Sequence, residues 1–93
     1  MKKINVSIKF INTSGGNSHV VIQSASVNIN YDVDGSRGPD NRSFHLWPGL
    51  YTIRVHGITG GTCILSIDGD LQIPVQTNCD GPNVYMQKQF IVQ

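Results

Sequence analysis

The sequence predicts an all-β protein, a single antiparallel β-sandwich of about seven strands, with an immunoglobulin-like or prealbumin-like arrangement. Residue usage is the first reason: the chain has twenty Val and Ile residues, one Ala and no Glu, so strand formers abound and strong helix formers are scarce. Alternating apolar and polar residues, bounded by turn residues at short intervals, are the second reason. A length of 93 residues favours one domain, spanning 1–93.

The first half of the chain alternates between apolar and polar residues in two long runs. Ile4, Val6, Ile8 and Phe10 share one face of the first run. In the second run the inward-facing set changes phase near Ser24-Ala25-Ser26, which we interpret as a β-bulge or a strand that crosses between sheets. The expected elements are strands at about 3–12, 19–33 and 42–46, with a turn at 12–18 and a loop at Asp34–Asn41.

A turn then starts the fourth strand. Pro48 presets φ for a tight turn, and Gly49 supplies the positive φ that a type II turn needs. Tyr51, Ile53 and Val55 then alternate with polar residues, as in a half-buried strand.

Two further strands flank a predicted hairpin turn at Asp68-Gly69-Asp70. A three-residue loop would pair Ile67 with Leu71 and Cys63 with Val75, which puts the apolar residues on one face. Pro74 cannot donate to a ladder, so its strand is an edge or breaks there. The last strand covers about 84–92, with Lys88 the exception in an otherwise apolar inward set. We expect the core to contain Val6, Ile8, Phe10, Ile22, Val27, Ile29, Phe44, Tyr51, Ile53, Val55, Leu65, Ile73, Met86 and Phe90.

The charge pattern argues against several partners. The formal net charge is +1 and the basic residues are dispersed, so the sequence predicts no nucleic-acid partner and no membrane partner. Met1-Lys2-Lys3 is typical of the start of a signal peptide, but the alternating residues that follow are not an apolar run. The compartment therefore stays open between the cytoplasm, export by a route that reads no signal peptide, and a leader already removed.

The stretch Leu46-x-Pro48-Gly49-x-Tyr51-x-Ile53-x-Val55 resembles the Pro-Gly-x-Tyr turn and strand of carboxypeptidase-regulatory-like domains. The wider group includes transthyretin-like (prealbumin-like) sandwiches and the B-type repeats of collagen adhesins. The resemblance covers about ten residues. It implies a seven-stranded prealbumin-like sandwich that serves as a structural, adhesive or binding accessory without catalysis.

The loop between the second and third expected strands is a candidate ligand site. Asp32, Asp34, Asp40 and Asn41 offer the oxygen ligands that calcium prefers. The spacing does not fit an EF-hand, and these residue types are also ordinary in turns, so we favour turn chemistry and expect no bound metal.

A second candidate is an aromatic platform of Trp47, His45 and Tyr51 for a sugar or a peptide. The competing interpretation is that Trp47 caps the sandwich and that Tyr51 packs in the core or makes a corner hydrogen bond. The three histidines lack the spacing of zinc ligands.

Cys63 and Cys79 could form one disulfide or remain free thiols. In the register above, Cys79 lies about four residues, roughly 13 Å, beyond the residue opposite Cys63, so a disulfide is not favoured. We find no pairing of a nucleophile with a base, and therefore expect no enzymatic activity and no cofactor.

The leading hypothesis is a non-catalytic structural or protein-interaction module, as a subunit of a larger assembly, with a protein partner or self-association. The alternative is a carbohydrate-binding module that uses Trp47 and the Asp34–Asn41 loop, with or without calcium.

Overall fold

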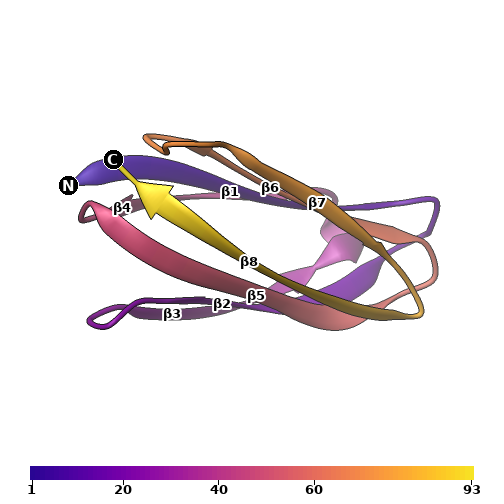
Figure 1. The fold of residues 1–93 in the computed structure, drawn as a ribbon. Helices are drawn as coiled ribbons and strands as arrows, with labels where there is room; N and C mark the ends of the chain where they lie inside the picture. The colour runs from indigo at the N-terminus through magenta and orange to yellow at the C-terminus, as the bar shows by residue number, and fades with distance from the viewer.

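Eight strands form two four-stranded antiparallel sheets that pack face to face in the computed structural model, which describes residues 1–93 (Figure 1). One sheet has the order β4-β1-β6-β7 and the other β3-β2-β5-β8. The predicted all-β sandwich is confirmed, with eight strands in place of about seven. The elements are β1 (Lys2–Ile11), β2 (Gly16–Gln23), β3 (Asn28–Asp34), the 3₁₀ turn η1 (Gly35–Arg37), β4 (Asp40–Leu46), β5 (Gly49–Thr59), β6 (Thr62–Gly69), β7 (Val75–Asp80) and β8 (Asn83–Val92).

The additional strand arises where one long strand was expected. Residues 19–33 do not form a single bulged or crossing strand, because the chain reverses at Ser24 and makes the β2–β3 hairpin within one sheet. The Ser24 N–H donates to the Val27 carbonyl (2.9 Å), and the Ser24 hydroxyl accepts from the backbone N–H groups of Ser26 and Val27. The phase change in the sequence marks this reversal, and its interpretation as a bulge was wrong.

The connection between β6 and β7 is longer than expected. Ile67 pairs with Val75, so the turn is not the three-residue loop Asp68-Gly69-Asp70. Gly69 instead continues β6 beside β1, where an added Cβ would lie 2.6 Å from the Lys3 carbonyl oxygen. Leu71 turns inward, is almost fully buried and forms a bridge with Val92.

The observed register differs from the predicted one in the cross-strand partner of each residue. It agrees with the prediction in the face of the sheet on which each side chain lies. Cys63 pairs with Cys79 in place of Val75, a shift of four residues. An even shift leaves every side chain on the same face of the strand, so alternation alone could not exclude it. Ile73 falls in the connection and is exposed, so its predicted place in the core was wrong. Pro74 directly precedes β7, which is an edge strand as predicted.

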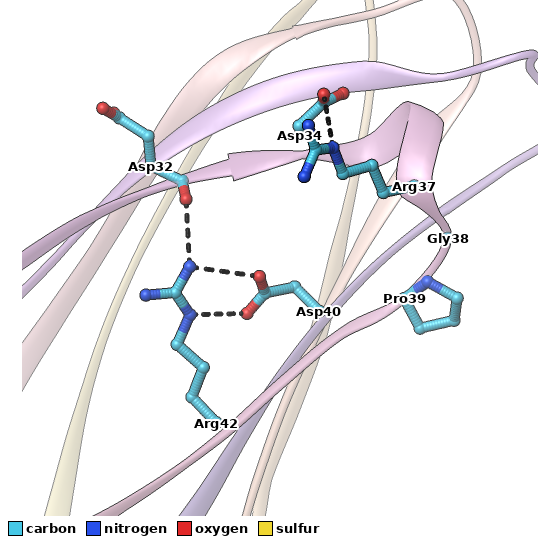
Figure 2. Close-up of a pocket in the computed structure, with 7 residues that line it drawn as sticks. All are labelled: Asp32, Asp34, Arg37, Gly38, Pro39, Asp40 and Arg42. Atoms are coloured by element: carbon cyan, nitrogen blue, oxygen red, sulfur yellow. Dashed lines mark hydrogen bonds and ion pairs between the residues drawn. The ribbon is translucent and has the colours of Figure 1, made fainter.

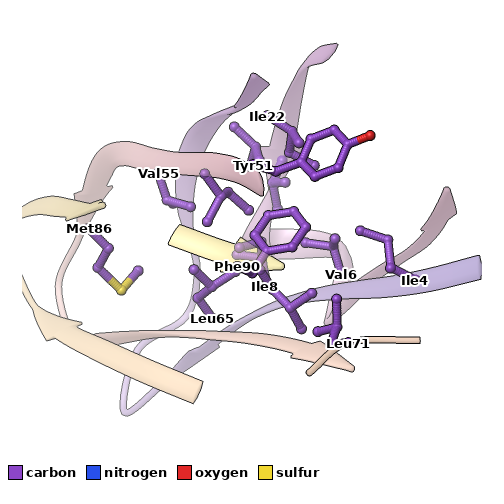
Figure 3. Packing of buried hydrophobic residues seen from close by; sticks show 14 of the residues in the cluster. Ile4, Val6, Ile8, Ile22, Tyr51, Val55, Leu65, Leu71, Met86 and Phe90 are labelled. Atoms are coloured by element: carbon purple, nitrogen blue, oxygen red, sulfur yellow. The ribbon is translucent and has the colours of Figure 1, made fainter. Parts of the chain in front are cut away.

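The inward faces of both sheets build one hydrophobic core (Figure 3). The rings of Tyr51 and Phe90 stack with centroids 5.5 Å apart. Four predicted core residues, Phe10, Val27, Ile29 and Phe44, are partly buried and pack against this cluster. The buried cluster comprises Ile4, Val6, Ile8, Val20, Ile22, Val33, Leu46, Tyr51, Ile53, Val55, Cys63, Leu65, Ile67, Leu71, Val84, Met86, Phe90 and Val92.

One residue of the edge strand β8 interrupts the inward apolar set of that strand. Lys88 pairs with buried Ile53 and so shares the inward phase of Met86 and Phe90, yet it is exposed. A charge placed in this way on an edge strand opposes pairing with another sheet.

The two ends of the sandwich differ in the segments they carry. Figure 1 shows both termini, the β4–β5 turn and the start of the β6–β7 connection at one end. Gly16 pairs with Thr59, which places the β1–β2 and β5–β6 turns together at the other end. No helix in the structure has the length and apolar character needed to cross a membrane.

Candidate functional site

A polar pocket of about 300 Å³ opens where β3, η1 and β4 meet (Figure 2). It coincides with the loop that the sequence indicated as a ligand site. Its lining is made of charged residues and the turn that joins them, with no large apolar side chain. The lining residues are Asp32, Asp34, Arg37, Gly38, Pro39, Asp40 and Arg42.

Asp34 caps the 3₁₀ turn at one side of this pocket. Its carboxylate accepts from the Ser36 hydroxyl (2.7 Å) and from the Ser36 N–H (3.0 Å), and Arg37 lies 3.6 Å away. These hydrogen bonds, with the charge of Arg37, lower the pKa of Asp34. Asp34 therefore has the geometry of an ordinary turn aspartate, with its charge already compensated.

Arg42 forms the opposite side of the pocket. Its guanidinium donates to both carboxylate oxygens of Asp40 (3.0 and 3.3 Å) and to the carbonyl oxygen of Asp32 (3.2 Å). The guanidinium also lies 4.0 Å from the centroid of the Tyr31 ring, a cation–π contact. The hydrogen bonds to Asp40 raise the pKa of Arg42. Because β3 and β4 belong to different sheets, Arg42 connects the two layers on this side of the sandwich.

Four of the pocket's charged groups thus form two ion pairs, Arg37 with Asp34 and Arg42 with Asp40. Figure 2 shows the Asp32 carboxylate directed away from Arg42 and Asp40, so the three carboxylates do not converge. Asn41 is exposed and pairs with Ser7 of β1. No group of three or more His, Cys or Asp side chains gathers anywhere in the structure in a way that could hold a metal ion.

The aromatic residues of the second candidate are dispersed. Trp47 is exposed in the β4–β5 turn, and His45 is exposed on β4 opposite Lys3. Tyr51 is buried in the core, where its hydroxyl donates to the Trp47 carbonyl oxygen (2.8 Å). The Tyr51 ring therefore offers no surface to a ligand, and it anchors the turn that presents Trp47.

Trp47 and the polar pocket lie at opposite ends of β4. Asp40 begins this strand and Trp47 directly follows it, so about 20 Å separates them along an extended chain. The aromatic residue and the loop that the sequence grouped as a carbohydrate site are thus two separate places.

Five large apolar side chains are exposed at the end of the sandwich that carries the termini. We call this surface the apolar end: Met1, Trp47, Leu50, Ile73 and Ile91. Their exposed fractions run from 39% to 73%. Leu50 and Ile91 are cross-strand partners, and the N–H of Gln72, next to Ile73, donates to the Ile91 carbonyl (3.1 Å). Of these five residues, the sequence analysis indicated only Trp47 as a surface residue, and it wrongly placed Ile73 in the core.

The outer face of the β3-β2-β5-β8 sheet carries a polar row that the sequence did not indicate. Asp32, His19, His56 and Tyr85 are successive cross-strand partners across its four strands. The two ring nitrogens of His19 lie within hydrogen-bond distance of side-chain oxygens, Nδ1 at 2.7 Å from Asp32 and Nε2 at 3.1 Å from Asn30. His19 and Asp32 become neighbours only through the β2–β3 hairpin, so a single long strand could not have revealed them.

A shallow hollow of about 410 Å³ lies at the opposite end from the apolar end. It contains no ionisable side chain, and so offers no acid or base. Its lining residues are Gly15, Gly16, Asn17, Ile58, Thr59, Gly60 and Pro82.

The fold defines the chain as a two-sheet β-sandwich protein. Comparison with known proteins adds no narrower class: no family model, curated protein or solved structure matches the chain.

Proposed function

We propose that this chain is a non-catalytic protein-interaction module, a structural subunit that binds a protein partner through the apolar end. The observation that carries the proposal is the location of five exposed large apolar side chains at one end of the sandwich.

Physical reasons favour a protein as the ligand of this surface. Contiguous exposed apolar patches are costly in water and commonly mark interaction sites. Trp is enriched among the residues that contribute most to protein–protein binding. The backbone that carries Trp47 is held by the Tyr51 hydroxyl, which reduces the conformational entropy lost on binding.

The resemblance to carboxypeptidase-regulatory-like and transthyretin-like domains supports the same role. In this proposal the Pro48-Gly49-x-Tyr51 turn has the function of presenting Trp47 while its tyrosine packs beneath. Domains of that group serve as structural or adhesive accessories, which agrees with the absence of a nucleophile–base pair in the sequence.

The carbohydrate alternative loses its composite site, because Trp47 and the Asp34–Asn41 loop lie at opposite ends of β4. A sugar would have to bind at one of the two places alone. The polar pocket has hydrogen-bonding groups, but most of them are engaged with each other. We therefore propose protein binding in preference.

Light scattering over a concentration series, combined with size-exclusion chromatography, tests the proposal without an identified partner. We expect association of the chain at high concentration, and a double variant Trp47→Ser/Ile73→Ser should weaken it about thirtyfold or more, as expected for loss of a binding hot spot. The matched control is Ile58→Ser, since Ile58 is exposed to a similar degree at the opposite end. This control should associate like the parent chain.

If the parent chain stays monomeric, the test is chemical crosslinking in an extract of cells that express the chain. The proposal then requires crosslinked proteins that the double variant loses and the Ile58→Ser control keeps. A monomer with the same crosslinked proteins in all three forms contradicts the proposal.

A further inference from the structure

The β6–β7 ladder brings the two cysteines of the chain directly opposite each other. Cys63 and Cys79 are Cα partners in the register, although their pairing could not be inferred from the turn at Asp68-Gly69. Cys63 is fully buried, and Cys79 is half-buried and packs against the same core cluster. Both side chains therefore lie on the inner face of the same sheet, and both thiols are free.

The backbone distance between the cysteines suits a disulfide. The Gly81 N–H donates to the Gly61 carbonyl (2.8 Å), which makes Gly61 and Gly81 a hydrogen-bonded pair. Such pairs alternate along an antiparallel ladder, so Cys63 and Cys79 also form one, with a Cα separation of about 5.5 Å. Disulfides span Cα separations of about 4.4–6.8 Å.

Closing the bond requires a small movement of β7. Opposed Cβ atoms at a hydrogen-bonded position lie about 5.5 Å apart, whereas a disulfide draws them to about 4 Å. β7 is an edge strand of six residues with one ladder neighbour, so it can make this shift without moving a second strand. A bond formed under such strain is readily reduced again.

The two thiols differ in their access to solvent. Burial, together with the nearby Cys79, raises the pKa of Cys63 to about 11. The Cys79 sulfur lies on the edge strand, 3.6 Å from the Asp80 carbonyl oxygen and 3.8 Å from that of Asn83. Cys79 is therefore the sulfur that an external reagent meets first.

We propose that Cys63 and Cys79 are a reversible oxidation site that forms a cross-strand disulfide by exchange with a low-molecular-weight disulfide of the glutathione class. The Cys79 thiolate attacks the reagent's disulfide, forms a mixed disulfide and releases one reagent thiolate. The Cys63 thiolate then attacks the Cys79 sulfur and releases the second. The two cysteine protons end on the two released thiols, and the two electrons lost by the cysteines reduce the reagent's S–S bond. The product ties the edge strand β7 covalently to β6.

Equilibration in buffers of reduced and oxidised glutathione tests the proposal on the parent chain. Each sample is quenched with an alkylating agent in denaturant, so that the buried Cys63 is also reached, and is analysed by intact mass. The reduced chain should take up two alkyl groups. The oxidised chain should take up none and remain a single chain on a non-reducing gel. Its mass should be about 2 Da below that of the reduced chain before alkylation, because the disulfide forms with the loss of two hydrogens.

Two variants check the order of the steps. Cys63→Ala should stop at a glutathione adduct on Cys79, whereas Cys79→Ser should leave the buried Cys63 unmodified in the folded chain. The proposal is overturned if the parent chain keeps both free thiols at every glutathione ratio, if it accumulates only the adduct, or if its only new disulfide joins two chains.

Discussion

At the scale of single residues, two buried tyrosine hydroxyls have opposite hydrogen-bonding states. The Tyr51 hydroxyl donates to the Trp47 carbonyl, while the Tyr31 hydroxyl is buried without a partner. Burial raises the pKa of Tyr31, because ionisation in the interior is costly. A satisfied buried hydroxyl stabilises the fold, and an unsatisfied one opposes folding.

These two tyrosines give a matched pair of variants. Tyr51→Phe should lower the free energy of unfolding by about 1 kcal/mol, because the Trp47 carbonyl loses its donor. Tyr31→Phe should leave the free energy of unfolding unchanged or raise it, because it removes an unpartnered polar group. Urea denaturation measures both. Equal losses in the two variants would contradict the assigned hydrogen bonding.

His19 gives the molecule a dependence on pH. The Asn30 amide nitrogen donates to Asn28 (2.7 Å), which turns the Asn30 oxygen toward the His19 ring. With the Asp32 carboxylate at the other nitrogen, the ring faces two acceptors, an arrangement that favours its doubly protonated form. The hydrogen bond to Asp32 first, and then that to Asn30, raise the pKa of His19 above its ordinary value of 6.5.

The sign of the effect follows from this raised pKa. The stabilisation from protonated His19 is fully present below pH 6.5 and is lost as the pH rises through the higher pKa of the folded state. Asp32→Asn should lower the pKa of His19, measured by NMR titration of the ring, and should flatten the fall in stability across this range. An unchanged His19 titration in the variant would show that the pair does not form in solution.

At the scale of elements, the close approach of β1 to the β5–β6 turn depends on one glycine. A Cβ on Gly61 would collide with the carbonyl oxygens of Ile11 and Asn12, which belong to the backbone and cannot move aside alone. A Cβ on the adjacent Gly60 would meet only the Thr13 hydroxyl, at an ordinary 3.5 Å.

The two neighbouring glycines should therefore respond differently to the same change. Gly61→Ala should lower the free energy of unfolding by about 2–4 kcal/mol, since the methyl group separates β1 from the turn. Gly60→Ala should change it by no more than about 0.5 kcal/mol. Thermal denaturation of both variants compares them directly, and similar melting temperatures would argue against so close an approach of the two segments.

Some features of the strands could be predicted from the sequence, and others could not. Alternation predicted the buried faces of β1 and β5, because each has one face on the core and one in solvent. Alternation did not predict that 19–33 is a hairpin, since the turn at Ser24 contains neither Gly nor Pro. Nor did it select the partner of Cys63, since registers that differ by four residues bury the same faces.

At the scale of the whole molecule, the proposed activities occupy opposite ends. The apolar end lies with the termini, whereas Cys63 and Cys79 lie near the β5–β6 turn, where Thr62 pairs with Ile11 at the far end of β1. Oxidation of the cysteines and binding at the apolar end therefore involve different surfaces. Failure of either experiment leaves the other proposal standing.

The sequence by itself determined the fold class, the single core and the turn that presents Trp47. These follow from local properties, namely β-propensity, period-two alternation and the backbone preferences of Pro48 and Gly49. Only the tertiary structure decided what those strands bring together: His19 with Asp32, Cys63 with Cys79, and Ile73 with the exposed apolar end. The reason is physical. Alternation specifies the face on which a side chain lies, whereas its neighbour across the sheet depends on register and strand order, which are set by packing between residues distant in the chain.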